Sequence, residues 1–352
     1  MNSHVVVPPI DDRVCVSVIV RTKDRPALLE EALSSLANQT YSEIELVVVN
    51  DGGTDVQSLI DDYRSVFSKI VYVNLKDNVG RARASAVGLQ NVSGDYIMFL
   101  DDDDLYDPDH IEGLLNAVVS DKEVRVAYSG VRAEVDGQEI YFNKPFSPEM
   151  LRFQNSIPIH SYIFHRSLLD DGVHIDEHMV IYDDWDFILQ LCEHTRFKHL
   201  DRVSATYRTG GDSDWGGLTP DHASVMKGVD LLWAKWCNKW SGKQIKETFI
   251  EIIEGHMMFS SMIKDKDKQI SNLTSRLPVD ENEGGCAVGR LAELENSNAY
   301  QARCLTELEE GNQKLMQELK QSVDNYRNLS SSTCWRITWP LRKCISFFRG
   351  YV

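Results

Sequence analysis

Residues 95–104 read DYIMFLDDDD, an apolar run that ends in four consecutive carboxylates. A short continuous apolar run with several β-preferring residues predicts a strand that is buried on both faces of a sheet. Ligands of such sheets lie at the carboxyl ends of the strands. Four adjacent acids repel one another, so we expect a positive group among them, and their oxygens suit a divalent cation that also holds phosphates. A solvated acidic turn or a helix N-terminus is the alternative.

The chain before this run repeats a pattern of strand, polar loop and helix. The expected strands cover 14–20, 44–49 and 70–73, and the expected helices begin near Pro26 with Asp24 as N-cap, cover about 55–67, and open at Gly80. This alternation predicts an α/β fold with a mostly parallel sheet and helices on both faces. The polar loops after the strands should therefore meet at one edge. The sequence contains neither a Walker loop nor GxGxxG, so neither a P-loop ATPase nor an ordinary dinucleotide enzyme is indicated.

Composition excludes several other classes. The 352 residues carry a formal net charge of −17, which argues against a nucleic-acid-binding protein. The seven cysteines form no CxxC pair, which argues against a disulfide framework or a structural zinc site and suits a reducing cytosol. No signal peptide and no run of 18 apolar residues is found, so we expect a protein made in the cytoplasm that does not span a membrane.

Four blocks of the sequence resemble the family 2 glycosyltransferases of GT-A fold, in both their order and their spacing. The blocks are RTKDRP at 21–26, VVVNDGGTD at 47–55, NVGRARA at 78–84 and FLDDDD at 99–104. The resemblance extends over about residues 14–210 and implies that the sheet edge holds a nucleoside-diphosphate sugar. It implies that Thr22 and Asp51 contact the nucleobase, with Asp24 nearby. It also implies that Asp101 and Asp102 contact the ribose and sugar, and that Asp103 ligates Mn²⁺ or Mg²⁺.

One departure from the family concerns the diphosphate. The family often has Ala-Arg-Asn where this chain has Ala84-Ser85-Ala86. Gly80 and Arg81 open a helix and offer amide N–H groups and a guanidinium, which together favour an anion site. Either Arg81 or Arg83 is expected to supply the missing positive charge.

A second acidic block follows at 182–191, YDDWDFILQL, which predicts a helix that starts near Asp184. Simple capping explains acids at this position. The block also resembles the family's Glu-Asp motif, which implies Asp184 as the base that takes the acceptor's proton in an inverting transfer. Asp183 stands where the family usually has Glu, and Asp186 is the alternative base.

The segments between and after these blocks carry further expectations. We expect a helix over 108–119, a strand over 124–135 with a hairpin turn, and a strand over 157–164 whose His160 is either structural or touches phosphate or acceptor. Tyr207-Arg208 resembles the family's Tyr-Arg block without its usual His. The glycines at 210 and 211 suit a mobile flap or a plain linker.

The C-terminal third predicts appendages to a catalytic domain. The expected parts are an N-terminal extension (1–13), a GT-A domain (14–215), a helical extension (216–264), a coiled coil (265–332) with a break near 278–289, and a basic aromatic tail (333–352). In the helical extension, Trp233, Trp236 and Trp240 share one face, which predicts core packing, with a binding surface as the alternative. The heptads predict homo-oligomers, or a single helix packed on its own domain. The tail suits an anionic bilayer surface, or an oligomer interface. It also resembles the Ser-x-Ser-Trp-Arg-x-Thr-x-Pro-Leu-Arg tail of bacterial surface-polysaccharide glycosyltransferases.

These features together predict an inverting, metal-dependent glycosyltransferase that acts on a glycan or lipid-linked acceptor in O-antigen or capsule synthesis. Its expected place is the inner face of the bacterial cytoplasmic membrane, as a peripheral protein. A non-catalytic scaffold that assembles partners through the coiled coil is the alternative. A nucleotidyltransferase on a related sheet is disfavoured by the Asp-Trp-Asp-Phe block at 184–187.

Overall fold

The computed structural model describes residues 14–135, 138–208, 222–248, 250 and 251. These residues belong to one compact unit that runs to Glu251. The expected N-terminal extension, glycine flap, coiled coil and tail lie outside the described residues. Within the described part of the chain, no helix is long and apolar enough to cross a membrane.

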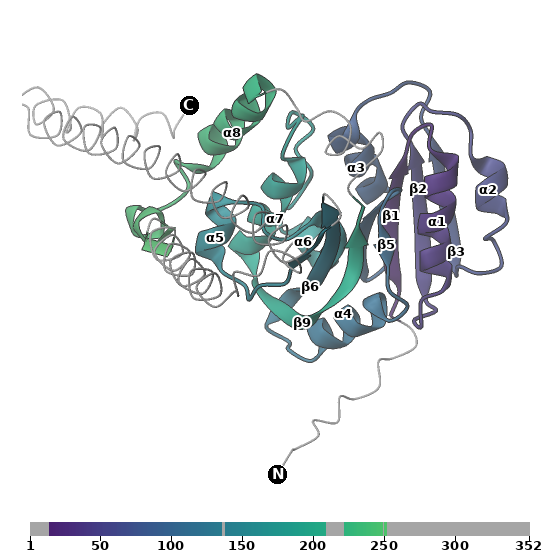
Figure 1. Ribbon diagram of the computed structural model, residues 1–352, viewed down its shortest axis with the longest axis horizontal. Helices are drawn as coiled ribbons and strands as arrows, with labels where there is room; N and C mark the ends of the chain where they lie inside the picture. The colour runs from purple at the N-terminus through teal and green to yellow at the C-terminus, as the bar shows by residue number, and fades with distance from the viewer. Residues whose placement is uncertain (1–13, 136–137, 209–221, 249, 252–352) are drawn as a thin grey trace, which may run out of the picture. The chain divides into compact units, whose positions relative to one another are not determined.

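The described residues form a mixed α/β fold around a nine-stranded sheet (Figure 1). The strands are β1 (Val16–Thr22), β2 (Ile44–Asn50), β3 (Lys69–Asn74), β4 (Tyr96–Asp101), β5 (Leu105–Tyr106), β6 (Val124–Val135), β7 (Gln138–Phe142), β8 (Tyr162–His165) and β9 (Arg196–Tyr207). The helices are α1 (Pro26–Ala37), α2 (Gln57–Asp61), α3 (Arg81–Gln90), α4 (His110–Val119), α5 (Pro148–Phe153), α6 (Ser167–Asp170), α7 (Asp183–His194) and α8 (His222–Trp236). The strand order is β3-β2-β1-β4-β8-β6-β9-β5, with β7 paired to β6.

The first four strands are parallel and are covered on both faces. Every residue of β1 and β2 is buried, which explains their continuous apolar runs. Val18 and Val20 belong to a core shared with α1 and α4, whereas Ile19 belongs to a second core shared with α3 and α7. Helices therefore lie on both faces of this half of the sheet, as expected (Figure 1).

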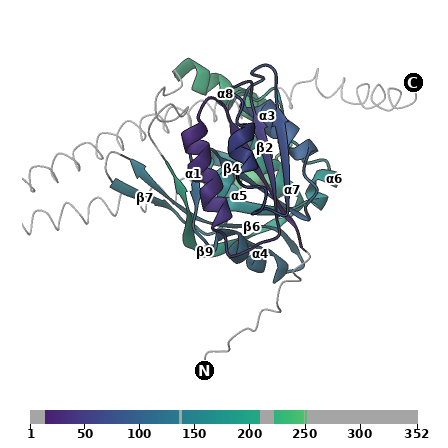
Figure 2. The ribbon, with the colours of Figure 1, turned by 90° about the vertical axis from the view of Figure 1, so that its right-hand side faces the viewer.

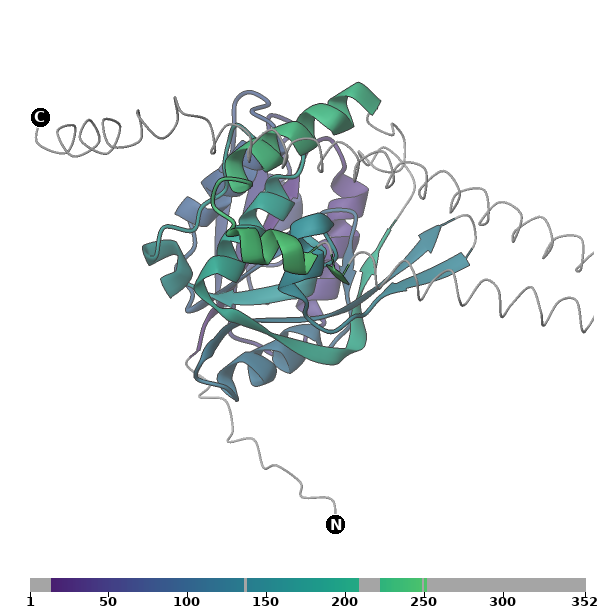
Figure 3. The same cartoon turned by 90° about the vertical axis from the view of Figure 1, so that its left-hand side faces the viewer.

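The second half of the sheet combines antiparallel and parallel pairs, which corrects the expectation of a mostly parallel sheet. β8 is antiparallel to both β4 and β6, and β5 is antiparallel to β9, while β6 and β9 are parallel. The β6–β7 hairpin projects from the body of the unit (Figures 2 and 3). The run of strand and helix signals in the sequence does not encode strand direction, so this reversal was not predicted.

Three local expectations also need correction. The strand expected over 157–164 is a 3₁₀ turn at Ile159–Ser161 followed by β8. The helix expected over about 55–67 is only α2. Asp24 is not the N-cap of α1, because Arg25 occupies that position and Asp24 has a left-handed backbone with φ 55°.

A buried carboxylate closes the sheet at the edge opposite the polar loops. Glu45 accepts hydrogen bonds from the hydroxyls of Ser17 and Ser93 and from the amide of Gly94, and it pairs with Lys69 Nζ at 2.7 Å. Burial raises the pKa of Glu45, but these partners outweigh it and lower the pKa to about 2. This network ties the starts of β1, β2 and β3 to the turn before β4.

Candidate active site

The carboxyl ends of β1, β2 and β4, the turn before α3 and the end of β9 surround one cavity of about 530 Å³. Its position confirms that the polar loops meet at one sheet edge. The lining residues that were expected at the site are Thr22, Asp24, Asp51, Arg81, Asp101 and Asp103. Arg21, Arg25 and Tyr207 line it as well and were not assigned from the sequence.

Asp51 and Asp24 build one wall by tying loops together. The two carboxylate oxygens of Asp51 accept the amides of Val79 at 2.7 Å and Gly80 at 3.0 Å. Asp24 accepts both the amide and the hydroxyl of Thr54, at 2.7 and 2.9 Å, and these hydrogen bonds lower its pKa. The loops after β1 and β2 and the turn before α3 are therefore held in register before any ligand arrives.

Gly52 allows this close approach of the loops. Its φ is +70°, and a Cβ at this position would lie 2.3 Å from the backbone nitrogen of Asn78. Any side chain would collide with a neighbouring backbone, which cannot move aside as a flexible side chain would.

The four acids after β4 each have a positive neighbour, as their mutual repulsion predicts. Asp101 accepts from Arg21 Nε at 3.1 Å, and Asp103 lies 3.0 Å from Arg25 NH1. Asp102 is fully buried and lies 2.5 Å from Arg25 NH2. Asp101 and Asp103 line the cavity, whereas Asp102 does not. The expected ribose and sugar contact of Asp102 is therefore not supported by its position.

Asp104, for which the sequence left open a helix cap or a group that orients Asp103, links three parts of the chain. It lies 2.8 Å from His160 Nδ1, and its other oxygen accepts the amide of Arg208 at 3.0 Å. Burial lowers the pKa of His160, but the charge of Asp104 outweighs it and the net pKa is raised. His160 is 1% exposed and does not line the cavity, so the structure favours its structural role.

Burial sets the ionisation of the acids in different directions. It raises the pKa of Asp102 to about 7 against the charge of Arg25. Burial also raises the pKa of Asp103, and the charges of Asp101 and Asp104 add to this effect. For Asp101 the same burial is outweighed by Arg21, so its pKa is lowered. Asp101 is therefore the most firmly ionised of the three.

Asp183 joins the start of α7 to the cavity. It is fully buried, and its Oδ1 accepts from Arg81 NH2 at 2.7 Å. Arg21 NH1 lies 3.9 Å from its other oxygen and donates to the hydroxyl of Ser85 at 2.8 Å. At the position where the family often has arginine, Ser85 thus faces the guanidinium of Arg21. The alternative cation, Arg83, is exposed and pairs with Glu177 away from the cavity lining.

Asp184, the expected base, does not line the cavity itself but follows Asp183 in the first turn of α7. Its Oδ2 accepts from Asn155 at 2.8 Å, and its Oδ1 accepts the amide of Trp185 at 2.8 Å. Burial raises its pKa, the charge of Asp183 adds to this, and Arg81 opposes it. A base whose pKa lies closer to neutrality holds a proton more readily during transfer.

Asp186, the alternative base, has a different role. It is fully buried, and it accepts from Trp236 Nε1 at 2.8 Å and Gln190 at 2.7 Å and pairs with Lys235 at 2.8 Å. These contacts fasten α8 to α7. Trp236 and Trp240 are 1% and 7% exposed in the core, as expected. Trp233 of the same stripe is 37% exposed, which corrects the expectation for that residue.

The described residues fit a cation that is shared with a substrate, not an all-protein metal cage. No cluster of three His, Cys, Asp or Glu side chains in the described part of the chain could hold a metal. Asp103 is the carboxylate of the predicted metal position that lines the cavity. Magnesium in proteins commonly has only one or two carboxylate ligands and completes its shell with substrate phosphates and water.

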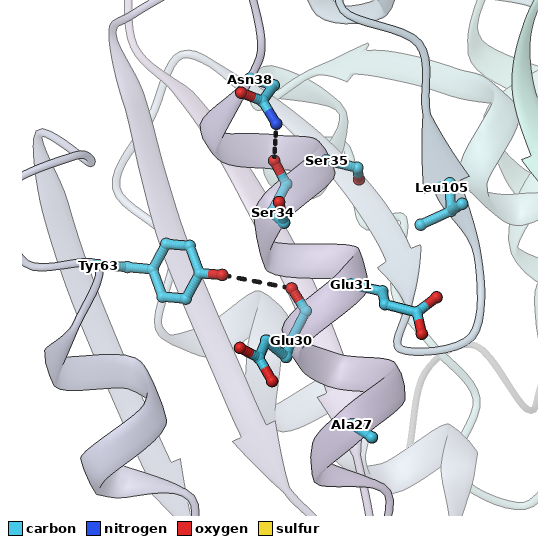
Figure 4. Close-up of a pocket in the computed structure, with 8 residues that line it drawn as sticks. All are labelled: Ala27, Glu30, Glu31, Ser34, Ser35, Asn38, Tyr63 and Leu105. Atoms are coloured by element: carbon cyan, nitrogen blue, oxygen red, sulfur yellow. Dashed lines mark hydrogen bonds between the residues drawn. The ribbon is translucent and has the colours of Figure 1, made fainter.

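A second hollow, of about 590 Å³, lies on the outer face of α1 (Figure 4). Two of its polar side chains already have partners on α1: Tyr63 donates to the carbonyl of Glu30, and Asn38 donates to that of Ser34. It is also more open than the strand-end cavity. No strand ends converge on it, so we do not assign it a ligand.

Comparison with known proteins gives a consistent picture. The profile of Glycosyl transferase family 2 matches residues 17–180. An uncharacterized glycosyltransferase of Bacillus subtilis (strain 168), YwdF, is 30% identical over 201 residues, which cover 54% of this chain and 73% of that protein. Glycosyltransferase GlyA of Streptococcus pneumoniae serotype 4 is 37% identical over 111 residues, which cover 31% of this chain and only 16% of GlyA.

Two solved structures share the fold. S. aureus TarS 1-349 in complex with UDP-GlcNAc has a TM-score of 0.56 at 19% identity, covering 70% of this chain and 73% of that one. Mannosyltransferase PcManGT from Pyrobaculum calidifontis, in complex with GDP-Man and Mn²⁺, has a TM-score of 0.51 at 18% identity, covering 83% and 82%.

Proposed function

The chain belongs to glycosyl transferase family 2 and is a glycosyltransferase, and we propose that it moves a sugar from a nucleoside-diphosphate sugar with inversion and with the help of Mn²⁺ or Mg²⁺. One observation carries this proposal. Arg81 lines the strand-end cavity together with Asp101 and Asp103, and it binds Asp183, the direct neighbour of the proposed base Asp184. The donor-side acids and the base are thus linked through one side chain.

The proposed transfer needs a base on the acceptor side and charge stabilisation on the donor side. Asp184 takes the proton of the acceptor hydroxyl while the oxygen of that hydroxyl bonds to the anomeric carbon. The nucleoside diphosphate leaves with the electron pair of the broken bond. A divalent cation held by Asp103 and the diphosphate would neutralise the charge of this leaving group. Asn155 and the amide of Trp185 orient Asp184 for this role.

The donor-binding residues keep the proposed assignments with one change. Thr22, Asp24 and Asp51 are proposed to contact the nucleobase, and Asp101 the ribose or sugar; their place in the cavity lining supports these assignments. Asp102 supports Asp103 through their common partner Arg25 and is not proposed to touch the donor. Because one structural neighbour was solved with UDP-GlcNAc and another with GDP-Man, UDP- and GDP-sugars are the first donors to test.

A donor screen with matched variants tests the proposal. The full chain is incubated with UDP-, GDP- and dTDP-sugars and Mn²⁺, and melting temperature and donor hydrolysis are measured. We expect one nucleotide class to stabilise the protein, Asp103→Asn and Asp184→Asn to lose turnover, and the exposed control Asp62→Asn to keep it. If no nucleotide sugar shifts the melting temperature and Asp103→Ala retains function in cells, the proposal fails. A product with the donor's own anomeric configuration would refute inversion.

The cellular role is proposed from the C-terminal sequence. We propose a glycan or lipid-linked acceptor in surface-polysaccharide synthesis, with homo-oligomers formed through 265–332 and contact of the tail (333–352) with an anionic membrane. Truncation after Ser332 should abolish binding to anionic vesicles without changing donor binding. Unchanged vesicle binding would remove the tail from this role.

A further inference from the structure

Arg25 stands between the cavity and the acids proposed to work with a cation. Its NH1 lies 3.0 Å from Asp103 Oδ2, and its Nε and NH2 lie 3.2 and 2.5 Å from the two oxygens of Asp102. Among the described residues, Arg25 is the only cation in an ion pair with Asp102 or Asp103. The other two acids of the run have different partners, since Asp101 pairs with Arg21 and Asp104 with His160. The guanidinium thus supplies the positive charge that the acids require when no cation is bound.

The backbone of Arg25 is held by its two neighbours, whereas its side chain is partly exposed and reaches the cavity. Asp24, just before it, is held in a left-handed conformation by two hydrogen bonds to Thr54, and Pro26, just after it, is the first residue of α1. The side chain of Arg25 is 28% exposed and lines the cavity. The guanidinium can therefore change partners without any movement of the fold.

A divalent cation and Arg25 compete for the same carboxylate. The cation would need an oxygen of Asp103, and two positive groups on one carboxylate repel each other. The planar guanidinium fork also suits phosphate oxygens, which the donor brings into this cavity. An exchange of partners satisfies both requirements: Asp103 passes to the cation and Arg25 passes to the diphosphate.

We propose that Arg25 is a positioning residue that holds Asp102 and Asp103 in the free enzyme and moves to the donor diphosphate when a divalent cation takes Asp103. This inference rests on the proposed function. Its consequence is that the cation and the nucleoside diphosphate bind cooperatively, since each removes an obstacle to the other, and this coupling must be reciprocal.

Binding measurements on the full chain test the exchange. Affinity for Mn²⁺ is measured by electron paramagnetic resonance of the free ion, and affinity for UDP and GDP by calorimetry, each with and without the other. For the wild type we expect weak binding of Mn²⁺ alone that the nucleotide strengthens by about 5- to 150-fold, the usual range of coupling. For Arg25→Gln we expect tighter Mn²⁺ binding without nucleotide, weaker nucleotide binding without Mn²⁺, and a smaller coupling factor.

Two further variants separate contact from charge. Lys23→Gln removes a positive charge from the same cavity lining but breaks no ion pair with the acids after β4. It should leave Mn²⁺ binding near the wild-type value. Arg25→Lys keeps the charge but loses the fork, so it should weaken the nucleotide and leave Mn²⁺ alone nearly unchanged. Circular dichroism checks folding, and Arg25→Lys carries the test if the glutamine variant is unstable.

The outcomes distinguish this inference from the proposed function. If Arg25→Gln binds Mn²⁺ alone no more tightly than the wild type, or if Lys23→Gln gains as much, the exchange does not occur. If the wild type binds no nucleoside diphosphate under any condition, the proposed function itself fails. A wild type that binds both ligands without coupling overturns only the inference.

Discussion

Asparagine substitutions at Asp184 and Asp186 should separate catalysis from folding within one turn of α7. Asp186 is fully buried with Lys235, Trp236 and Gln190 around it. Asparagine can still accept one hydrogen bond there, but it loses the charged one from Lys235. Asp184, by contrast, is held by neutral donors and lies beside the ion pair of Asp183 with Arg81.

The expected magnitudes differ in both stability and rate. A hydrogen bond to a charged group contributes about 1.5–3 kcal/mol, and Lys235 keeps a second partner, Asp176, at 2.7 Å. We expect Asp186→Asn to lower the free energy of unfolding by about 2 kcal/mol, or about 4–8 °C in Tm. Burial raises the pKa of Asp184, so its charged form is disfavoured in the fold. Asp184→Asn should therefore cost little stability but reduce transfer by about 10²- to 10⁴-fold.

Two assays on the same samples decide the matter. Urea unfolding gives the stability of each variant, and initial rates with saturating donor and acceptor give kcat. The reasoning is refuted if Asp186→Asn loses turnover at unchanged stability while Asp184→Asn retains it. The assignment of the base would then pass to Asp186.

Three shorter predictions follow from the same contacts. Arg81→Gln removes a charge that lowers the pKa of Asp184. The fall of kcat/KM at acid pH, where the base becomes protonated, should therefore move to higher pH, and a pH–rate profile in which it does not move contradicts this. Glu45, with a pKa of about 2, adds stability above its ordinary value of 4.5 that is lost as pH falls toward 2. Glu45→Gln should cost about 2 kcal/mol at pH 7, allowing for its exposed lysine partner, and flatten acid unfolding curves. Gly52→Ala should lower stability by more than about 2 kcal/mol, because its Cβ would meet Asn78; calorimetry with an unchanged Tm would contradict this.

Much of the first half of the sheet, from β1 to β4, could be predicted from the sequence because its signals are local. The buried strands are continuous apolar runs, and the polar residues that follow them meet at the sheet edge whenever the strands are parallel. Asp51, Asp101 and Asp103 reached the cavity for this reason. The second half reverses strand direction through contacts between distant segments, such as Ile97 with Phe164, which leave no local trace.

Partner choice among charged residues was the other part that the sequence could not show. Asp102 and Asp103 are adjacent in the same acidic run, yet one is buried and the other lines the cavity. Asp184 and Asp186 differ likewise, because Lys235 and Trp236 reach Asp186 from a helix 50 residues away. The two arginines of the RTKDRP block could have suggested ion pairs with the acids at 101–104. The block alone does not say which acid each arginine pairs with.

The pairing of the cavity's arginines with acids also governs how a donor arrives. The chain carries a formal net charge of −17, so its long-range field repels an anionic nucleotide sugar. The guanidinium groups of Arg21, Arg25 and Arg81 are compensated by neighbouring carboxylates, and their field falls off within a Debye length of about 8 Å at physiological salt. Electrostatic steering from a distance is thus weak for this enzyme. Donor capture begins only after the diphosphate has entered the cavity, and higher ionic strength should speed its arrival rather than slow it.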